Sequence, residues 1–537
     1  MQPTLLTPPE ISRYLDDGSW TKETQAERFA YYAAVRPSAI ACQDPTGAVT
    51  WAELDAATDQ LAANLVDLGL SRDSRALVRM PSGYREVVAR IALKKAGIIG
   101  AFVPMQWRLR ELDYVRERIA PELLIMTAED SNDEAEREWA ETAFCGFRVD
   151  LTGNAKAGWC QWSKIADRTP AYANLKALTD RTFAYDEVSL ITASSGTSGL
   201  AKLCEWPEAA QMCIGRAIGA RLSLTAEDTV GIFSPLSGAA GVLVWLVSGT
   251  TPAKFVFPPN YHPSSLLDLT VKIGVTVATT VPVILARLAQ EPLANYDLTN
   301  LRALRIGTAA ADMDAAYLFE NGADCRVVVA AGSMECPGFA HADFNEDKET
   351  RLSGAIGLRL PGGQTKIVDG DGREVQAGEI GELMVSAPYA ASGYWNDDNA
   401  TQAAWSDGWF ATGDMGCLLP DGRLRLMGRL RETINRSGLK ILPAEVEREL
   451  SRHPSVFECA VVAASDKEYG EVPWAFIQLQ PDHSLSTEAL VVQLRDQGMA
   501  SYKIPVRFIA VDRFPRVADN KIDKKRLMET VSVSAYE

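Results

Sequence analysis

Residues 194–202 carry the motif that decides the fold, and they read Ser194-Ser195-Gly196-Thr197-Ser198-Gly199-Leu200-Ala201-Lys202. The motif directly follows an apolar run, residues 188–191, which predicts a strand that ends at this loop. Glycines let backbone N–H groups approach an anion closely, Ser and Thr hydroxyls donate further hydrogen bonds, and lysine adds positive charge. The stretch therefore predicts a phosphate-binding loop after a strand.

The loop has two alternative interpretations. Its spacing does not fit the Walker A motif, in which Gly-Lys is followed by Ser or Thr, so a kinase-like P-loop is not expected. A solvated Gly/Ser turn after a strand has the same composition. The remaining motifs of the chain have to decide between a turn and a phosphate site.

Length and composition limit the class of protein. The chain has 537 residues, more than one hydrophobic core usually supports, and 47% of them are hydrophobic. We therefore expect a large part divided into subdomains and a smaller module. The formal net charge of −16 argues against a nucleic-acid surface, which needs clustered Lys and Arg, so no nucleic-acid partner is expected.

Cysteine usage and hydropathy indicate the compartment. Nine scattered cysteines form no C-x-x-C pair, which predicts reduced thiols in the cytoplasm and neither disulfides nor a zinc site. The first residues lack the basic flank and long apolar core of a signal peptide. The most apolar run, residues 238–247, is shorter than the roughly 20 residues that span a bilayer, so we expect a buried helix and no membrane partner.

The first two thirds of the chain alternate between helical and strand patterns. Apolar residues at helical spacing, from Leu54 to Leu68, predict a helix that ends before Gly69. Runs that predict strands lie at residues 76–78, 100–103, 275–281, 303–306 and 326–330, with a helical pattern at 283–288. This rhythm predicts an α/β fold, with a large N-terminal domain of layered α/β subdomains.

The pattern changes near Gly354. Shorter strand-like runs with Asp-Gly turns at residues 369–372 and 421–422 predict a β-rich subdomain. The polar stretch 429–433 is the predicted domain boundary, which divides the chain into a large domain of residues 1–431 and a small, mobile α+β domain of residues 432–537. In the small domain we expect a helix from Pro443, strands at 459–463 and 475–479, and a helix at 488–496.

Four further motifs accompany the glycine loop in a fixed order. They are Gly332-Ser333-Met334-Glu335, Gly381-Glu382-Leu383 with Gly393-Tyr394-Trp395-Asn396, Trp409-Phe410-Ala411-Thr412-Gly413-Asp414 with Gly428-Arg429, and Asn520-Lys521-Ile522-Asp523-Lys524. Taken in sequence, these motifs resemble the adenylate-forming superfamily of acyl-CoA synthetases, peptide-synthetase adenylation domains and luciferases. The resemblance covers nearly the whole chain. Within the superfamily, the sequence most resembles stand-alone aryl-acid AMP ligases and aryl-CoA ligases.

The resemblance implies an ATP site with Mg²⁺. Lys202, Glu335 and Lys521 are the implied catalytic residues, and Glu335 is the implied magnesium ligand, since a hard cation suits carboxylate and phosphate oxygens. The implied nucleotide-binding residues are Ser195, Gly196, Thr197, Ser198, Gly199, Gly307, Thr308, Gly332, Ser333, Met334, Asp414 and Arg429. Asp414 takes the place of the family's ribose-binding carboxylate.

Taken singly, these residues have ordinary interpretations. A lone glutamate after a strand is usually solvated, Asp414 fits a Thr-Gly-Asp turn, and Lys521 lies in a charged run that is typical of a surface. Only the ordered set favours the site. Glu432 matches the hinge position between the two domains, or is a plain linker residue, and Gly438 is expected to line a thiol tunnel after the small domain swings.

The substrate pocket departs from the family pattern. Ala330 and Ala331 stand where members often place an aromatic residue against adenine, so adenine packing must come from elsewhere. Gly238 and Ala239 replace the polar residues that read an ortho-hydroxyl or an α-amino group, which argues against salicylate and α-amino acids. The implied pocket residues are Ser237, Gly238, Ala239, Trp245, Ala309 and Cys336, although the glycines here also suit close helix packing.

The expected function is ATP-dependent conversion of a carboxylic acid, best an aryl acid, to its acyl-AMP. The acyl group is then transferred to coenzyme A or to the phosphopantetheine of a carrier protein. Rival hypotheses are a β-amino or other amine-bearing acid, an amine acceptor, and a non-catalytic nucleotide-binding protein. A monomer or homodimer is expected, and none of His262, His341, His453 and His483 falls in a recognisable site.

Overall fold

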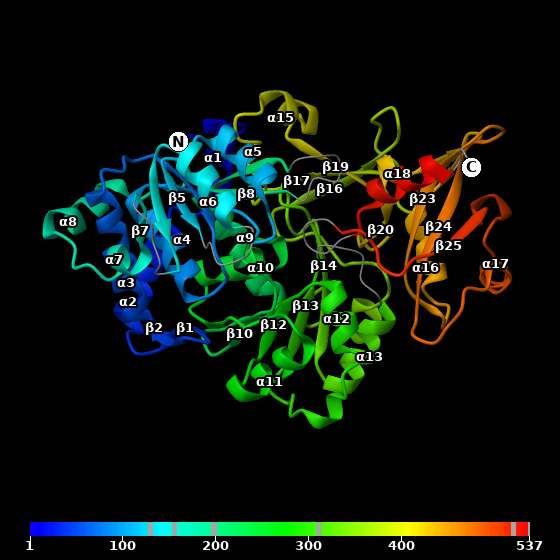
Figure 1. Ribbon diagram of the computed structural model, residues 1–537, viewed down its shortest axis with the longest axis horizontal. Helices are drawn as coiled ribbons and strands as arrows, with labels where there is room; N and C mark the ends of the chain where they lie inside the picture. The colour runs from blue at the N-terminus through cyan, green and yellow to red at the C-terminus, as the bar shows by residue number, and fades with distance from the viewer. Residues whose placement is uncertain (127–132, 153–157, 195–200, 308–312, 517–521, 535–537) are drawn as a thin grey trace. The chain divides into compact units, whose positions relative to one another are not determined.

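The computed structural model describes residues 1–126, 133–152, 158–194, 201–307, 313–516 and 522–534 (Figure 1). The chain forms two compact units, one of Met1–Thr365 with Val385–Phe410 and one of Lys366–Met384 with Ala411–Glu537. The divisions between these two compact units all lie before residue 431. The predicted boundary between residues 431 and 432, beyond which the small domain is expected to be mobile, stays a prediction. The α/β fold class is confirmed by the arrangement of sheets and helices described below.

The first unit contains two large, mostly parallel sheets. One has eight strands in the order β15-β14-β13-β12-β10-β11-β1-β2, and the other has seven in the order β7-β6-β5-β3-β4-β8-β9. The first sheet comprises β15 (Ala340–His341), β14 (Arg326–Ala331), β13 (Ala303–Ile306), β12 (Val277–Thr280), β10 (Thr229–Ile232), β11 (Lys254–Val256), β1 (Ile40–Asp44) and β2 (Gly47–Thr50). The second comprises β7 (Cys160–Gln161), β6 (Phe147–Asp150), β5 (Leu123–Met126), β3 (Arg75–Arg79), β4 (Ile99–Phe102), β8 (Val188–Ala193) and β9 (Leu203–Pro207).

Helices cover the faces of these sheets, as parallel connections require. They are α1 (Pro8–Asp16), α2 (Gln25–Val35), α3 (Trp51–Asp67), α4 (Tyr84–Ala96), α5 (Leu109–Ile119), α6 (Asp133–Thr142), α7 (Trp162–Ala166), α8 (Tyr172–Arg181), α9 (Glu208–Arg221), α10 (Ala239–Trp245), η1 (Leu246–Gly249), α11 (Pro263–Ile273), α12 (Pro282–Leu288), η2 (Leu293–Asn295), α13 (Met313–Ala323), α14 (Lys348–Arg351) and α15 (Asp398–Ala404). Several of these helices begin at capping residues that can be recognised in the sequence. At α3, for example, Thr50 and Glu53 form a capping box, in which the N–H of Thr50 donates to Glu53 at 2.8 Å.

Alternate residues of the eight-stranded sheet face different environments. Leu304 and Ile306 of β13 and Val327 and Val329 of β14 belong to a buried hydrophobic cluster that also holds residues of α11, α12 and α13. Because side chains alternate along a strand, the residues between them face the other side of the sheet. That side carries the polar residue Arg305, to which we return below.

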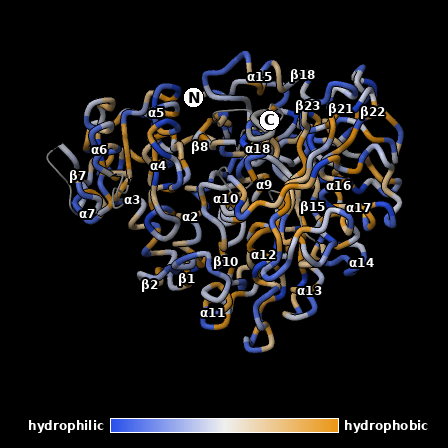
Figure 2. Tube along the Cα trace, turned by 45° about the vertical axis from the view of Figure 1, so that its right-hand side comes forward, coloured by the Kyte–Doolittle hydropathy of each residue, from blue (hydrophilic) through white to orange (hydrophobic). Residues whose placement is uncertain are grey.

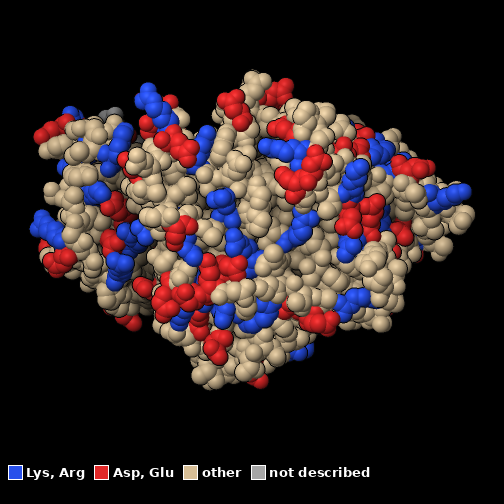
Figure 3. Space-filling model, turned by 180° about the vertical axis from the view of Figure 1, so that it is seen from behind, with Lys and Arg blue, Asp and Glu red and all other residues tan. Residues whose placement is uncertain are grey.

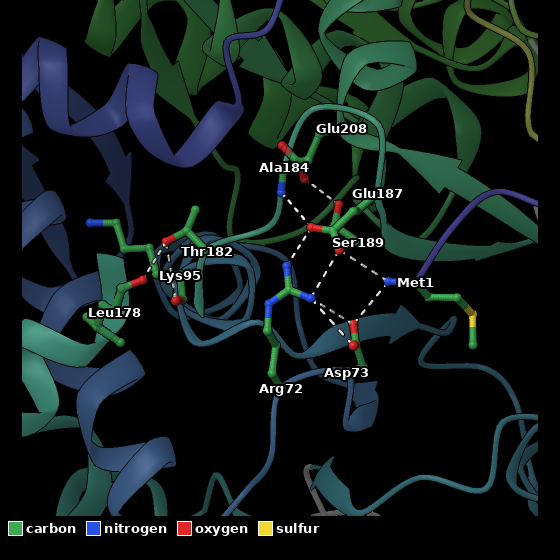
Figure 4. Close-up of polar contacts among 10 residues, drawn as sticks. All are labelled: Met1, Arg72, Asp73, Lys95, Leu178, Thr182, Ala184, Glu187, Ser189 and Glu208. Carbon is green, nitrogen blue, oxygen red and sulfur yellow. Dashed lines mark hydrogen bonds and ion pairs between the residues drawn. The ribbon is translucent and has the colours of Figure 1, made fainter. Parts of the chain in front are cut away.

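The start of β8 is held by an ion-pair cluster (Figure 4). The N-terminal ammonium of Met1 lies 3.0 Å from Oδ1 of Asp73 and 3.6 Å from Oε1 of Glu187. Nη1 of Arg72 donates to Oε1 of Glu187 at 3.0 Å, and the N–H of Val188 donates to the Met1 carbonyl at 3.0 Å. The strand that leads to the glycine loop is therefore fixed at its first residue.

The second unit contains a five-stranded sheet that is antiparallel except for β25, and most of a second five-stranded sheet. The strand orders are β22-β21-β24-β23, with β25 beside β24, and β16-β17-β19-β18, with β20 beside β19. The strands of these two sheets are β16 (Gln364–Val368), β17 (Gly381–Ser386), β18 (Trp405–Ser406), β19 (Trp409–Leu418), β20 (Leu424–Arg429), β21 (Ile434–Arg436), β22 (Leu439–Ile441), β23 (Val456–Asp466), β24 (Gly470–Leu479) and β25 (Arg507–Ala510), of which β18 belongs to the first unit. The helices are η3 (Leu430–Glu432), α16 (Pro443–Leu450), α17 (Thr487–Asp496), η4 (Ser501–Lys503) and α18 (Lys524–Ser534). β25 runs parallel to β24, whereas β23 and β24 form a long antiparallel hairpin.

The predicted elements are confirmed in type and differ only at their ends. The apolar run 238–247 is the buried helix α10 continued by the 3₁₀ turn η1. Asp369-Gly370 and Asp421-Gly422 lie in turns next to β16 and between β19 and β20. Pro443 opens α16, as the sequence predicts.

Hydrophobic and charged residues occupy different parts of the structure. Figure 2 shows hydrophobic segments in the interior strands and hydrophilic ones in outer loops, and in Figure 3 Lys and Arg are interspersed with Asp and Glu on the face shown. All nine cysteines are free thiols, and eight of them are buried or half-buried while Cys145 is exposed. Among the helices of the described residues, none combines the length and the hydropathy that crossing a membrane requires.

A glycine contact tests the packing of α9 on η1. A Cβ atom on Gly215 would lie 2.4 Å from the carbonyl oxygen of Leu246, whereas one on Gly219 would lie 3.3 Å from Cγ1 of Val247, a contact that a shift of a side chain, without the backbone, relieves. Gly215→Ala is therefore expected to lower the free energy of unfolding by about 1–3 kcal/mol through overpacking. Gly219→Ala is the matched control and is expected to be neutral or slightly stabilising, because Ala favours a helix over Gly.

Urea denaturation of both variants, followed by circular dichroism, gives the two free energies. Equal free energies for Gly215→Ala and Gly219→Ala would contradict the close approach of α9 and η1.

Candidate functional site

The glycine loop leaves from the hairpin of β8 and β9. Ala193 pairs with Leu203 in antiparallel register, the N–H of Ser194 donates to the carbonyl of Lys202 at 2.8 Å, and the N–H of Lys202 donates to Oγ of Ser194 at 3.3 Å. The two ends of the loop are thus held together directly after a strand. The predicted phosphate-binding residues Ser195, Gly196, Thr197, Ser198 and Gly199 lie outside the described residues.

The Glu335 motif follows β14 in a tight turn. The N–H of Ser333 donates to the carbonyl of Cys336 at 3.2 Å, and the N–H of Cys336 donates to Oγ of Ser333 at 3.3 Å. A Cβ atom on Gly332 would lie 2.5 Å from the backbone nitrogen of Gly338, so only glycine fits there. The turn buries Met334 and Glu335, which are 6% and 8% exposed.

Tyr394 holds the Glu335 carboxylate. Its hydroxyl donates to Oε1 of Glu335 at 3.0 Å, and the N–H of Ala391 donates to the Glu335 carbonyl at 2.8 Å. Tyr394 is itself buried, and its ring packs edge-on against Trp405 with 5.0 Å between the centroids. Segment 391–394 therefore fixes both the backbone and the side chain of Glu335.

Lys202 lies on the ring of the same tyrosine. Its Nζ is 4.6 Å from the ring centroid of Tyr394, a distance typical of a cation–π contact. The backbone supports this contact, because Cys204 forms a β-bridge with Tyr394 and the N–H of Trp395 donates to the Leu203 carbonyl at 2.7 Å. The structure thus brings together two of the predicted catalytic residues, Lys202 and Glu335, around one aromatic side chain.

Electrostatics keep Tyr394 a hydrogen-bond donor. Burial raises its pKa well above the usual 10, and the Glu335 carboxylate beside it raises the pKa further. Burial also raises the pKa of the Cys204 thiol, and so does Glu335, while Lys202 lowers it. Both groups are therefore neutral at physiological pH, so the Tyr394 hydroxyl keeps the proton that it donates to Glu335.

The cluster suits a magnesium nucleotide. The described residues contain no group of three or more His, Cys, Asp or Glu side chains arranged to hold a metal. Mg²⁺ commonly takes one or two protein carboxylates and completes its shell with phosphate oxygens and water. Glu335, whose Oε1 accepts one hydrogen bond from Tyr394, keeps further lone pairs for such a cation.

The remaining predicted residues of the first unit lie at strand and helix ends. Gly307 directly follows β13, and a Cβ atom there would lie 3.0 Å from the Ala330 carbonyl oxygen. Ser237, Gly238 and Ala239 lead into α10, whose last residue, Trp245, is 1% exposed. Cys336 is buried behind Glu335, while Thr308 and Ala309 lie outside the described residues.

The second unit holds the predicted ribose-binding pair. Asp414 and Arg429 face each other on β19 and β20, with 2.9 Å between Oδ1 of Asp414 and Nε of Arg429. The N–H of Asp414 donates to Oγ1 of Thr412 at 3.0 Å, and Gly413 has a φ of 68°, which favours glycine. Asp414 is thus a positioned carboxylate, 7% exposed, within a strand.

The predicted hinge residue forms an ion-pair cluster within the second unit. Nζ of Lys524, at the start of α18, lies 2.8 Å from Oε2 of Glu432 and 2.8 Å from Oε1 of Glu447 in α16. Burial lowers the pKa of Lys524, but Glu447 and Glu432 outweigh it and the net pKa is raised. Gly438 lies in the exposed turn between β21 and β22 with a φ of 89°, and Lys521 lies outside the described residues.

Sequence reasoning missed the part played by Tyr394. The residue belongs to a quoted motif, but its contacts with Glu335 and Lys202 join segments far apart in the chain. A tyrosine directly after Gly393, within an apolar stretch, was the available signal. It predicts a buried side chain and says nothing about its partners.

Comparison with known proteins gives the family. Residues 29–395 match the family model of the AMP-binding enzyme, and residues 445–521 match that of the AMP-binding enzyme C-terminal domain. Among the solved structures, the anthranilate CoA ligase AuaEII in complex with anthranoyl-AMP is 22% identical and superposes with a TM-score of 0.85 over 96% of this chain and 98% of its own. That likeness concerns the fold.

Two relatives extend the similarity over the whole chain. The pyochelin synthase PchD of Pseudomonas aeruginosa (strain UCBPP-PA14) is 30% identical, with 97% of this chain and 94% of the relative covered. A salicylyl-CoA synthase / salicylate adenylyltransferase of a Streptomyces species is 27% identical, with 97% and 96% covered. With both family models matched in order, this chain belongs to the AMP-binding enzymes and is an AMP-forming, adenylate-forming ligase that activates an acid with ATP.

Proposed function

We propose that this ligase activates an aromatic carboxylic acid as its acyl-AMP and transfers the acyl group to a thiol. The observation that carries the proposal is the contact of Glu335, in the turn after β14, and of Lys202, directly before β9, with the buried side chain of Tyr394. The two substrates, ATP and a carboxylic acid, are both anions. They require a lysine and a carboxylate held in place, as these two groups are around one side chain. The presence of Lys202, Glu335, Asp414, Arg429 and Lys521 together in one chain argues against a non-catalytic nucleotide-binding protein.

The chemistry joins two anions. A carboxylate oxygen of the acid attacks the α-phosphorus of ATP, the bond to the β-phosphate oxygen breaks, and pyrophosphate leaves. Lys202 offsets negative charge that builds on the phosphates, and Lys521 has the same role at the α-phosphate. Glu335 is the ligand for Mg²⁺, which supplies further charge neutralisation on phosphate oxygens when bound. Asp414, with Arg429 beside it, accepts hydrogen bonds from the ribose hydroxyls.

An aromatic acid is supported by the pocket residues and by a relative. Gly238 and Ala239 place no bulky side chain at the start of α10, as a site for a planar ring requires. The name of the Streptomyces relative states that it acts on salicylate. This chain lacks a polar side chain at Gly238 and Ala239 for an ortho-hydroxyl, so the acid we propose is aromatic without being salicylate.

A thiol is the proposed acceptor. The thiolate attacks the acyl carbonyl carbon of the adenylate, and AMP leaves. Gly438, in a turn whose neighbour Ser437 also has a positive φ of 49°, offers a surface without a side chain for the arm of coenzyme A or of a carrier-protein phosphopantetheine. Glu432 is the proposed hinge residue between adenylation and this second step.

The first test measures pyrophosphate release from ATP across aryl, alicyclic, β-amino and α-amino acids, followed by thioester detection with coenzyme A. Aryl acids are expected to support release and thioester formation. Activity with amine-bearing acids alone, or no release with any acid, would contradict the proposal.

Lys521→Ala tests the role of this lysine. Acyl-AMP formation is expected to fall about 100-fold or more, because the charge on the transition state is no longer offset, while the Kd for ATP changes by less than about threefold. Lys525→Ala, on the exposed face of the same segment, is the matched control and is expected to keep wild-type activity. Unchanged adenylation in Lys521→Ala would remove the proposed role.

Tyr394→Phe tests the support of Glu335. The ring remains for Lys202 and Trp405, but the carboxylate loses its hydroxyl partner, so we expect pyrophosphate exchange about tenfold lower at limiting Mg²⁺ and recovery at high Mg²⁺. Tyr389→Phe is the matched control, because its buried hydroxyl donates to the Leu360 carbonyl at 3.2 Å and not to Glu335.

Both tyrosine variants are expected to lose about 1 kcal/mol of stability, the usual contribution of one hydrogen bond. An identical Mg²⁺ titration for Tyr394→Phe and the wild type would show that Tyr394 has no positioning role.

A further inference from the structure

An arginine lies inside the eight-stranded sheet. Arg305 of β13 pairs with Thr279 of β12 and Val328 of β14 in parallel register, and it is 3% exposed. Its chain neighbours Leu304 and Ile306 belong to the hydrophobic cluster formed with α11, α12 and α13. Because side chains alternate along a strand, the guanidinium faces the opposite side of the sheet.

The protein partners of Arg305 are neutral. Nε donates to Nε2 of His341 at 3.3 Å, and Nη1 lies 3.5 Å from Oγ1 of Thr279. Nδ1 of His341 is 2.6 Å from the Ala342 carbonyl oxygen and therefore carries the proton, which leaves Nε2 as the acceptor. Burial, and then the charge of Arg305, lower the pKa of His341 to about 3, so the imidazole is uncharged at neutral pH.

The charge of Arg305 is not offset within the described part of the chain. Burial lowers its pKa to about 10, so the guanidinium is still protonated at neutral pH. Other buried arginines of this unit each face a carboxylate: Arg79 faces Glu136, Arg90 faces Glu86 and Arg351 faces Glu320. No described carboxylate pairs with Arg305 in this way. A buried charge without a counter-charge is destabilising, so its presence calls for an anion from outside the chain.

The guanidinium lies next to the proposed acid pocket. Thr279, its neighbour on β12, donates its hydroxyl to the carbonyl of Ala240 at 3.1 Å, and Ala240 follows directly on Gly238 and Ala239. On the other side, a Cβ atom on Gly307 would lie 3.6 Å from Nη1 of Arg305. Arg305 thus lies between the end of β13 and the start of α10, where the aromatic ring is proposed to bind.

We propose that Arg305 binds a second carboxylate on the acid substrate, so that the preferred substrates are aromatic dicarboxylic acids. The inference rests on the proposed function and narrows its substrate class. One carboxylate reacts with ATP, while the other pairs with the guanidinium, whose free N–H groups suit a carboxylate in a bidentate geometry. Gly238 and Ala239 leave room for the ring between the two groups.

The test compares benzoate with benzene-1,2-, benzene-1,3- and benzene-1,4-dicarboxylate in ATP–pyrophosphate exchange. For the wild type, kcat/KM for one dicarboxylate is expected to exceed that for benzoate by about 100-fold, since a site built for a charged group discriminates strongly against its absence. In Arg305→Met this preference is lost, with kcat/KM for the dicarboxylate falling about 100-fold and that for benzoate changing by less than about threefold. Arg305→Lys, which keeps the charge without the bidentate geometry, is expected to be intermediate.

Thermal stability separates binding from a structural role. Arg351→Met breaks a buried ion pair with Glu320 and is the matched control, expected to lower the Tm clearly. Arg305→Met removes an unpaired charge and is expected to change the Tm far less. The preferred dicarboxylate should raise the Tm of the wild type and leave that of Arg305→Met unchanged.

Two results would overturn the inference and leave the proposed function intact. They are a wild-type enzyme that uses benzoate as well as every dicarboxylate, and an Arg305→Met variant that loses activity on all acids in proportion to a lowered Tm. If Arg305→Met does not fold, Arg305→Lys decides, because an unchanged preference for the dicarboxylate with Lys would contradict bidentate binding. Exchange with amine-bearing acids and with no aryl acid would contradict the proposed function itself.

Discussion

The hydrogen bond from the Tyr394 hydroxyl to Oε1 of Glu335 is the interaction on which the described part of the site depends. It fixes a carboxylate that is almost entirely buried and would otherwise lose its hydration without compensation. The same ring supports Lys202, so one neutral side chain keeps opposite charges apart and in place. The close turn at Gly332 and the bridge between Cys204 and Tyr394 both bring the backbone to where this contact forms.

Sequence alone predicted the elements well and the contacts poorly. Strands such as β8, β13 and β14 are short apolar runs that end at glycines, and hydrophobic patterning is sufficient to predict them. The positions of Lys202 and Glu335 after strands were likewise predictable from the motifs, whereas Asp414, which fits a Thr-Gly-Asp turn in the sequence, lies within β19. Which side chain meets Glu335 was not predictable, because Tyr394 comes from a distant segment and its partner is chosen by tertiary packing.

The burial of Arg305 was likewise not predictable from the sequence. The sequence Ala303-Leu304-Arg305-Ile306 correctly predicts a strand. Because arginine is mostly exposed in proteins, nothing in the sequence predicts that this one is buried. The structure places that strand between β12 and β14, where both neighbours are buried. Whether a charged residue in a strand is buried depends on where that strand lies in the sheet. Strand order depends on long-range pairing, which local propensity does not encode.

The ammonium group of Lys524 has a mechanical consequence for the small domain. Because it binds Glu432 and Glu447 at the same time, it connects the carboxylate of the proposed hinge residue with α16 and the start of α18. A swing that preserved both bridges would have to find its torsional freedom upstream of Glu432, in the short turn that leaves β20. A swing that used Glu432 itself would have to break an ion pair in every catalytic cycle, and its rate would then rise with ionic strength.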